Sequence, residues 1–74
     1  MPSLRYTAIF EPGEHGGCHA FVPALTGCHS YGDTLEEARS SLREAIALYL
    51  EDLQAEGEPP PSEELVFDTV EVAA

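Results

Sequence analysis

One long helix is the feature that most constrains how this chain can fold. Thr34 is a favourable helix N-cap, and Glu37 three residues later completes a capping box. In that motif the Thr34 hydroxyl accepts from the Glu37 amide, and the Glu37 carboxylate reaches back to the Thr34 amide. Gly57 and the prolines at 59–61 then end the helix. A helix over residues 35–56 would be roughly 33 Å long, enough to cover a three- or four-stranded sheet.

The helical segment is amphipathic. Apolar residues recur at three- and four-residue spacing, which is typical of one buried face. They are Leu35, Ala38, Leu42, Ala45, Ile46, Tyr49 and Leu53. The opposite face carries Glu37, Ser40, Glu44, Glu51 and Asp52. We therefore expect the helix to pack on a sheet with its acidic face in solvent.

Period-two alternation and turn residues predict strands around this helix. Residues 4–11, 18–22 and 28–31 read as three strands joined by short loops, which favours an antiparallel meander. Residues 65–72, after the prolines, read as a final strand. The prediction is an α+β domain spanning residues 1–74, of order β-β-β-α-β, with one antiparallel-rich sheet packed by one long helix.

Two details of the sheet follow. With Leu25 near the centre of the second hairpin, Cys18 should lie opposite Gly32 rather than Cys28. A small sheet with one helix also leaves edges with unpaired backbone groups, which favours strand-to-strand self-association into a dimer or a larger assembly. Either edge, residues 4–10 or residues 65–72, could pair with another chain. The candidate edge-strand interface, on one face of the first strand, is Leu4, Tyr6, Ala8 and Phe10.

Charge limits the classes of partner. Fourteen acidic residues face three basic ones, Arg5, Arg39 and Arg43, and the formal net charge is −11. Three scattered arginines cannot neutralise a run of phosphates, so we expect neither direct nucleic-acid binding nor docking on anionic membranes. A basic protein would be attracted. The chain shows no apolar run of the ~18 residues that a membrane helix needs and no secretory signal, so the expected location is the cytoplasm.

One stretch resembles a known family. Gly-Gly at 16–17 precedes a strand, Pro-x-Leu-x-Gly-Cys occupies 23–28, and Gly-Asp-Thr-x-Glu-Glu-Ala occupies 32–38. This pattern resembles the N-terminal domain of HicB-type antitoxins, and the similarity extends from Tyr6 to about Phe67. The motif residues are Pro23, Leu25, Gly27, Cys28, Gly32, Asp33, Thr34, Glu36, Glu37 and Ala38.

The resemblance implies a partial ribonuclease H-type fold and oligomerisation. It also implies binding to a small basic HicA-like toxin that degrades messenger RNA, and neutralisation by covering the toxin's RNA-binding and catalytic surface. The sequence departs from the family pattern at Cys18, where an aromatic residue is usual, and at Ala24 and Thr26, which replace Asp and Pro of the turn. The chain ends at Ala74 without the family's DNA-binding segment, so operator binding is not expected.

Cysteines and histidines suggest other chemistry. Cys18-His19 and Cys28-His29, with His15 nearby, could hold zinc, but adjacent strand residues point to opposite faces. A nucleophilic pair of Cys28 with His15 or His19 lacks a recognisable oxyanion loop.

Three clustered carboxylates, Asp33, Glu36 and Glu37, could suggest a divalent-metal nuclease, yet the helix start explains them. We expect no metal, no cofactor and no catalysis. The leading hypothesis is an antitoxin-type protein; the alternatives are a homo-oligomeric domain without a toxin and, third, a metal-binding enzyme.

Overall fold

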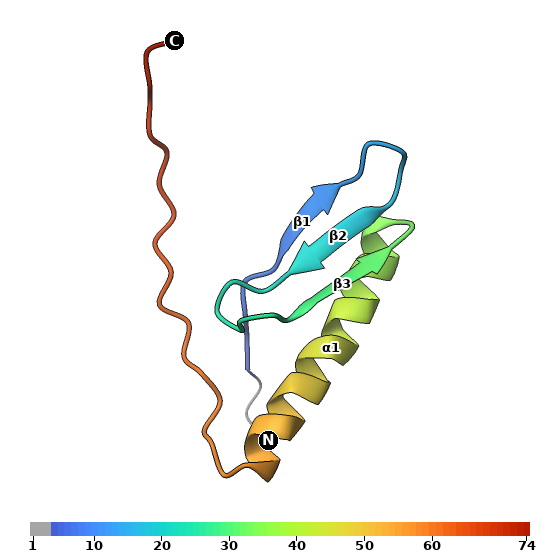
Figure 1. Cartoon of the computed structure of the whole chain (residues 1–74), viewed down its shortest axis with the longest axis vertical. Coiled ribbons are helices and arrows are strands. Elements are labelled where there is room, and N and C mark those ends of the chain that lie inside the picture. Colours follow the sequence, from blue (N-terminus) through green and yellow to red (C-terminus); the bar gives the residue numbers. More distant parts are fainter. Residues whose placement is uncertain (1–3) are drawn as a thin grey trace.

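A three-stranded antiparallel sheet and one helix make up the fold. The computed structural model describes residues 4–74, and its strands are β1 (Ile9–Pro12), β2 (Cys18–Phe21) and β3 (His29–Gly32). They lie in the order β1-β2-β3, and the helix α1 (Leu35–Ala55) covers one face of the sheet (Figure 1). The predicted α+β class, with an antiparallel meander followed by a long helix, is confirmed.

The register of the second hairpin is the predicted one. Cys18 pairs with Gly32 and Phe21 pairs with His29 across β2 and β3. The connecting turn is held by backbone hydrogen bonds from the Val22 amide to the Cys28 carbonyl, 3.1 Å, and from the Cys28 amide to the Leu25 carbonyl, 2.9 Å. Leu25 is fully buried at the centre of this turn, so its side chain closes one end of the core.

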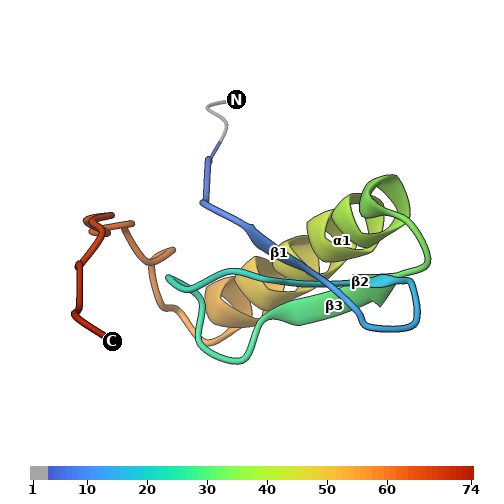
Figure 2. The same cartoon turned by 90° about the horizontal axis from the view of Figure 1, so that it is seen from above.

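The outer strands differ from the prediction. The first strand begins at Ile9, and residues 4–8 have no strand partner. The predicted strand over residues 65–72 is wrong: this segment pairs with no strand and runs apart from the sheet (Figures 1 and 2). Alternation and β-branched residues make a segment competent for a sheet, but a strand exists only where another chain segment satisfies its backbone groups.

The helix starts where the sequence predicts. Thr34 is the N-cap, and its hydroxyl accepts from the Glu37 amide at 3.1 Å. The return bond differs from the expected capping box, because the Glu37 carboxylate accepts from the Asp33 amide, 3.0 Å away, and not from that of Thr34. The helix ends at Ala55, and Gly57 takes a φ of 77° that lets the chain turn away.

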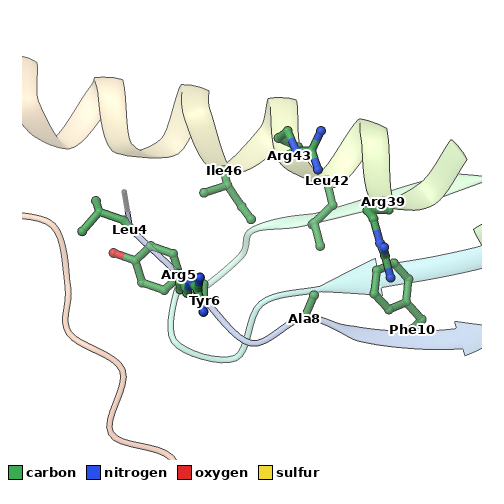
Figure 3. Close-up of a pocket in the computed structure, with 9 residues that line it drawn as sticks. All are labelled: Leu4, Arg5, Tyr6, Ala8, Phe10, Arg39, Leu42, Arg43 and Ile46. Atoms are coloured by element: carbon green, nitrogen blue, oxygen red, sulfur yellow. The ribbon is translucent and has the colours of Figure 1, made fainter. Parts of the chain in front are cut away.

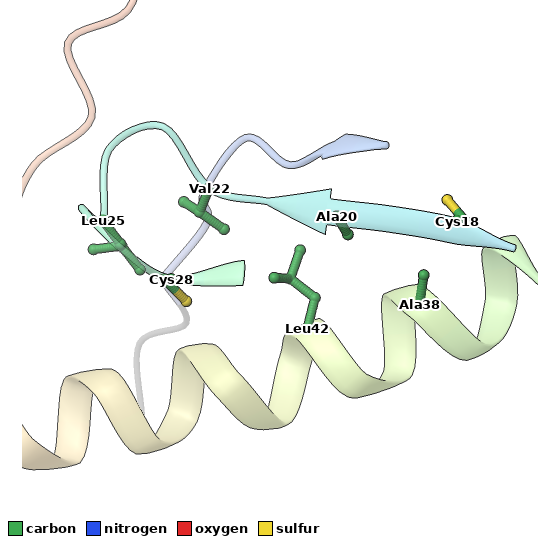
Figure 4. Packing of buried hydrophobic residues seen from close by; sticks show 7 residues of the cluster. All are labelled: Cys18, Ala20, Val22, Leu25, Cys28, Ala38 and Leu42. Atoms are coloured by element: carbon green, nitrogen blue, oxygen red, sulfur yellow. The ribbon is translucent and has the colours of Figure 1, made fainter. Parts of the chain in front are cut away.

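The core between sheet and helix is built from small side chains (Figure 4). Its buried members are Cys18, Ala20, Val22, Leu25, Cys28, Ala38 and Leu42. Gly32 lets the helix approach closely, since a Cβ there would lie 2.3 Å from the Ala38 nitrogen. Leu35 was expected on the buried face but is 50% exposed, because the first helical turn lies at the end of the sheet.

The N-cap gives a direct test of the helix start. Changing Thr34 to Ala leaves the Glu37 amide without its acceptor and should lower the free energy of unfolding by about 1 kcal/mol. Thr34→Ser keeps an acceptor and should cost much less. Ser40→Ala, on the exposed face of the same helix, is the matched control and should stay within about 0.5 kcal/mol of the native protein. Equal losses for Thr34→Ala and Ser40→Ala in urea denaturation would contradict the cap.

Burial of Cys28 predicts a loss of stability in alkali. Desolvation raises the pKa of the Cys28 thiol above its ordinary value, because burial disfavours the thiolate. The unfolded chain then loses this proton first, so the contribution to stability is complete below the ordinary thiol pKa of roughly 8.5 and declines above it. Between pH 7 and pH 10, the free energy of unfolding should fall less steeply for Cys28→Ala than for the native chain. Val22→Ala, which removes buried volume but no thiol, should keep the native slope.

Candidate partner-binding surfaces

The family-motif residues build the turn and the helix start. Leu25 and Cys28 are buried in the core, and Gly27 adopts a φ of 81° that suits glycine. Asp33 and Glu36 are exposed beside the first turn of α1. The motif residues thus divide between buried positions in the core and turn and exposed positions at the helix start.

The cysteines and histidines lie on opposite sides of the sheet. Cys18 and Cys28 are buried under α1 as free thiols, whereas His19 and His29 lie on the outer face. In the segment from residue 4 to residue 74, no group of three or more His, Cys, Asp or Glu side chains is gathered in a way that could hold a metal ion. Strand alternation therefore separates Cys28 from His19, the pair considered as a nucleophile and base.

The outer face of the sheet carries a cluster of rings. The His19 ring stacks on Phe21 with centroids 5.8 Å apart and lies 5.4 Å from His29. Its Nδ1 atom is 3.4 Å from a carboxylate oxygen of Glu11, and Tyr31 on the neighbouring strand is 57% exposed. From the sequence, His19 and His29 were considered only as zinc ligands or as a base, and not as neighbours of Phe21 and Tyr31. The signal that could have found the cluster is the combination of period-two alternation with the register set by the Leu25 turn.

A groove runs along the other face, beside the helix (Figure 3). It exists because α1 lies over β3 and β2, which leaves the helix-side face of the first strand uncovered. The groove encloses about 530 Å³. Its apolar lining consists of Leu4, Tyr6, Ala8 and Phe10 on one side, with Leu42 and Ile46 on the other. The four predicted edge-strand residues thus face the helix.

All three arginines of the chain line this groove. Arg5 comes from the N-terminal segment, and Arg39 and Arg43 lie one turn apart on α1. The Arg39 guanidinium lies 5.8 Å from the centre of the Phe10 ring, a cation–π distance. The description of these residues as scattered is therefore wrong in three dimensions. We call this surface the arginine groove.

The solvent-facing side of α1 is acidic. Glu37, Ser40, Glu44, Glu51 and Asp52 are all exposed, as the sequence predicts. Leu48 lies among them on the helix and is 62% exposed. We call Glu44, Leu48, Glu51 and Asp52 the acidic stripe. Carboxylates around an exposed leucine combine long-range attraction for cations with a small apolar contact.

Over the part of the chain that the structure describes, α1 is too polar to cross a membrane, and no other helix is present there.

Comparisons with known proteins agree with this architecture. The family model described as HicB_like antitoxin of bacterial toxin-antitoxin system matches residues 6–72. UPF0150 protein ssr1765 of Synechocystis sp. is 49% identical over 68 residues, covering 92% of this chain and 86% of the relative. A UPF0150 protein of Helicobacter pylori is 51% identical over 53 residues, covering 72% of each chain.

A solved structure is also similar. A chain of the HicA3 and HicB3 toxin-antitoxin complex superposes with a TM-score of 0.63 and 31% sequence identity, covering 82% of this chain and 70% of that chain. This protein belongs to the HicB-like antitoxin family.

Proposed function

We propose that this protein binds a small basic RNA-degrading toxin and neutralises it by contact, without catalysis. The observation that carries the proposal is the match of residues 6–72 to an antitoxin family, together with the net charge of −11. The similar solved chain was determined in a toxin-antitoxin complex, which supports a partner of this kind.

The distribution of charge favours the acidic stripe as the contact surface. A basic toxin would be repelled by the arginine groove, where all three arginine side chains lie. The stripe is on the solvent side of α1 and carries Glu44, Glu51 and Asp52 without a neutralising basic side chain of its own. Opposite charge accelerates encounter and fixes orientation, while the exposed Leu48 adds apolar contact at the centre.

Neutralisation then follows from competition. A toxin that cleaves RNA must present cations to the phosphate backbone. Carboxylates held along a rigid helix can occupy the same cations, so the bound antitoxin would exclude the RNA. Such inhibition needs no reactive group on this chain, and it should weaken as salt screens the carboxylates.

Charge reversal on the stripe tests the proposal. The variant Glu44→Lys with Glu51→Lys should bind a small basic RNA-degrading toxin, sought first in the neighbouring genes, about tenfold more weakly than the native chain, mainly through a slower association rate. Isothermal titration and stopped-flow mixing give the affinity and the rate. RNA cleavage by the toxin should resume at antitoxin concentrations that the native protein renders inactive.

The matched control is Glu56→Lys with Glu58→Lys, which makes the same change in net charge beyond the end of α1. It should keep most of the affinity. Equal losses for both variants would show that net charge and not the stripe is responsible. Undiminished binding by the stripe variant would place the toxin on another surface, and the absence of any binding by the native chain would remove the toxin hypothesis.

A further inference from the structure

The C-terminal arm, residues 64–74, is an apolar segment left in solvent. Val66, Val70 and Val72 are 93%, 84% and 77% exposed, and Phe67 is 68% exposed. The arm has no strand partner and runs beside the sheet without joining it (Figures 1 and 2). Exposing four large apolar side chains within seven residues is unfavourable in water, so the arm is suited to being covered.

The arginine groove has the complementary composition. It is an uncovered channel with an apolar floor and three guanidinium groups, none of which pairs with a carboxylate within residues 4–74. The arm carries three carboxylates, Glu64, Asp68 and Glu71, between its apolar residues. The net charge of the chain is −11, so most of its surface repels an acidic segment. The arginine groove would attract such a segment.

The arm's own groove is poorly placed to receive it. The chain enters the arm at Glu63, whose carboxylate accepts from both the amide and the hydroxyl of Thr7. Thr7 is the one residue of the 4–8 segment that does not line the groove. The Tyr6 hydroxyl donates a third hydrogen bond, 2.8 Å long, to the Pro61 carbonyl. The arm therefore leaves from the far side of the segment that borders the groove, and it points away from its own helix.

We propose that residues 64–72 of one chain lie in the arginine groove of a second copy, whose arm occupies the first groove in return. The apolar arm residues contact Tyr6, Ala8 and Ile46, and Asp68 and Glu71 approach Arg39 and Arg43. Such an exchange is self-complementary: a two-fold axis relates the two chains, and each groove holds the arm of the other chain. No arm or groove is left to bind a third chain. It does not depend on a toxin, and it leaves the acidic stripe free.

Charge exchange between two variants tests the pairing. In the groove variant Arg39 and Arg43 become Glu, and in the arm variant Asp68 and Glu71 become Lys. Each variant alone places like charges together, which costs several kcal/mol, so the dimer dissociation constant should rise at least about 100-fold. An equimolar mixture restores opposite charges at both contacts and should form a heterodimer. Light scattering and sedimentation give the masses.

The control is Glu51→Lys with Asp52→Lys, which matches the arm variant in net charge and should remain dimeric like the native chain. Circular dichroism checks folding. If the groove variant does not fold, Val70→Glu, at a fully solvated site of the arm, should by itself give a folded monomer. The exchange would be overturned if the native chain is monomeric, or if the groove variant or the Val70→Glu variant is dimeric. It would also be overturned if the mixture of the two charge variants stays monomeric. Since these measurements contain no toxin, their failure leaves the proposed inhibition untouched.

Discussion

The close contact between the end of β3 and the first turns of α1 determines the rest of this fold. Gly32 has no side chain, and a Cβ at this position would come within 2.3 Å of the Ala38 nitrogen. The helix therefore packs closely on β3 and β2. Of the helix residues, only Ala38 and Leu42 are buried. Thr34 fixes the start of the helix at the same place, so position and direction are set within seven residues. Small side chains bury little apolar volume, so the stability of this core depends on the close approach of the helix to the sheet.

That placement also creates the surfaces on which function depends. Because α1 lies to one side of the sheet, the helix-side face of the N-terminal segment stays open and becomes the arginine groove. Meanwhile the acidic stripe faces solvent on the C-terminal half of the helix. The chain thus separates its few cations from most of its carboxylates. The two surfaces therefore differ in charge and would attract partners of opposite charge.

Local patterns predicted the local structure well. The cap at Thr34, the stop at Gly57 and the pairing of Cys18 with Gly32 are all properties of a few neighbouring residues, and the structure confirms them. The predicted bond from the Thr34 amide to the Glu37 carboxylate was wrong, because that carboxylate can also reach the adjacent Asp33 amide. The sequence does not decide between the two amides. The strand over residues 65–72 failed because a strand requires a second segment in register. The groove was missed for the same reason: Arg5 meets Arg39 and Arg43 only after the helix has packed on the sheet. The candidate interface at Tyr6 and its neighbours stays a prediction.

The run of prolines at 59–61 has a consequence for association. Each pyrrolidine ring fixes one backbone dihedral, so the link between α1 and the arm has few conformations to lose. The hydrogen bond from Tyr6 to the Pro61 carbonyl anchors the end of that link to the body of the protein. The base of the arm is thereby held against the body of the protein before anything binds the arm. A receptor for the arm need not bear the entropic cost of ordering a flexible tail, and a modest contact area can hold it.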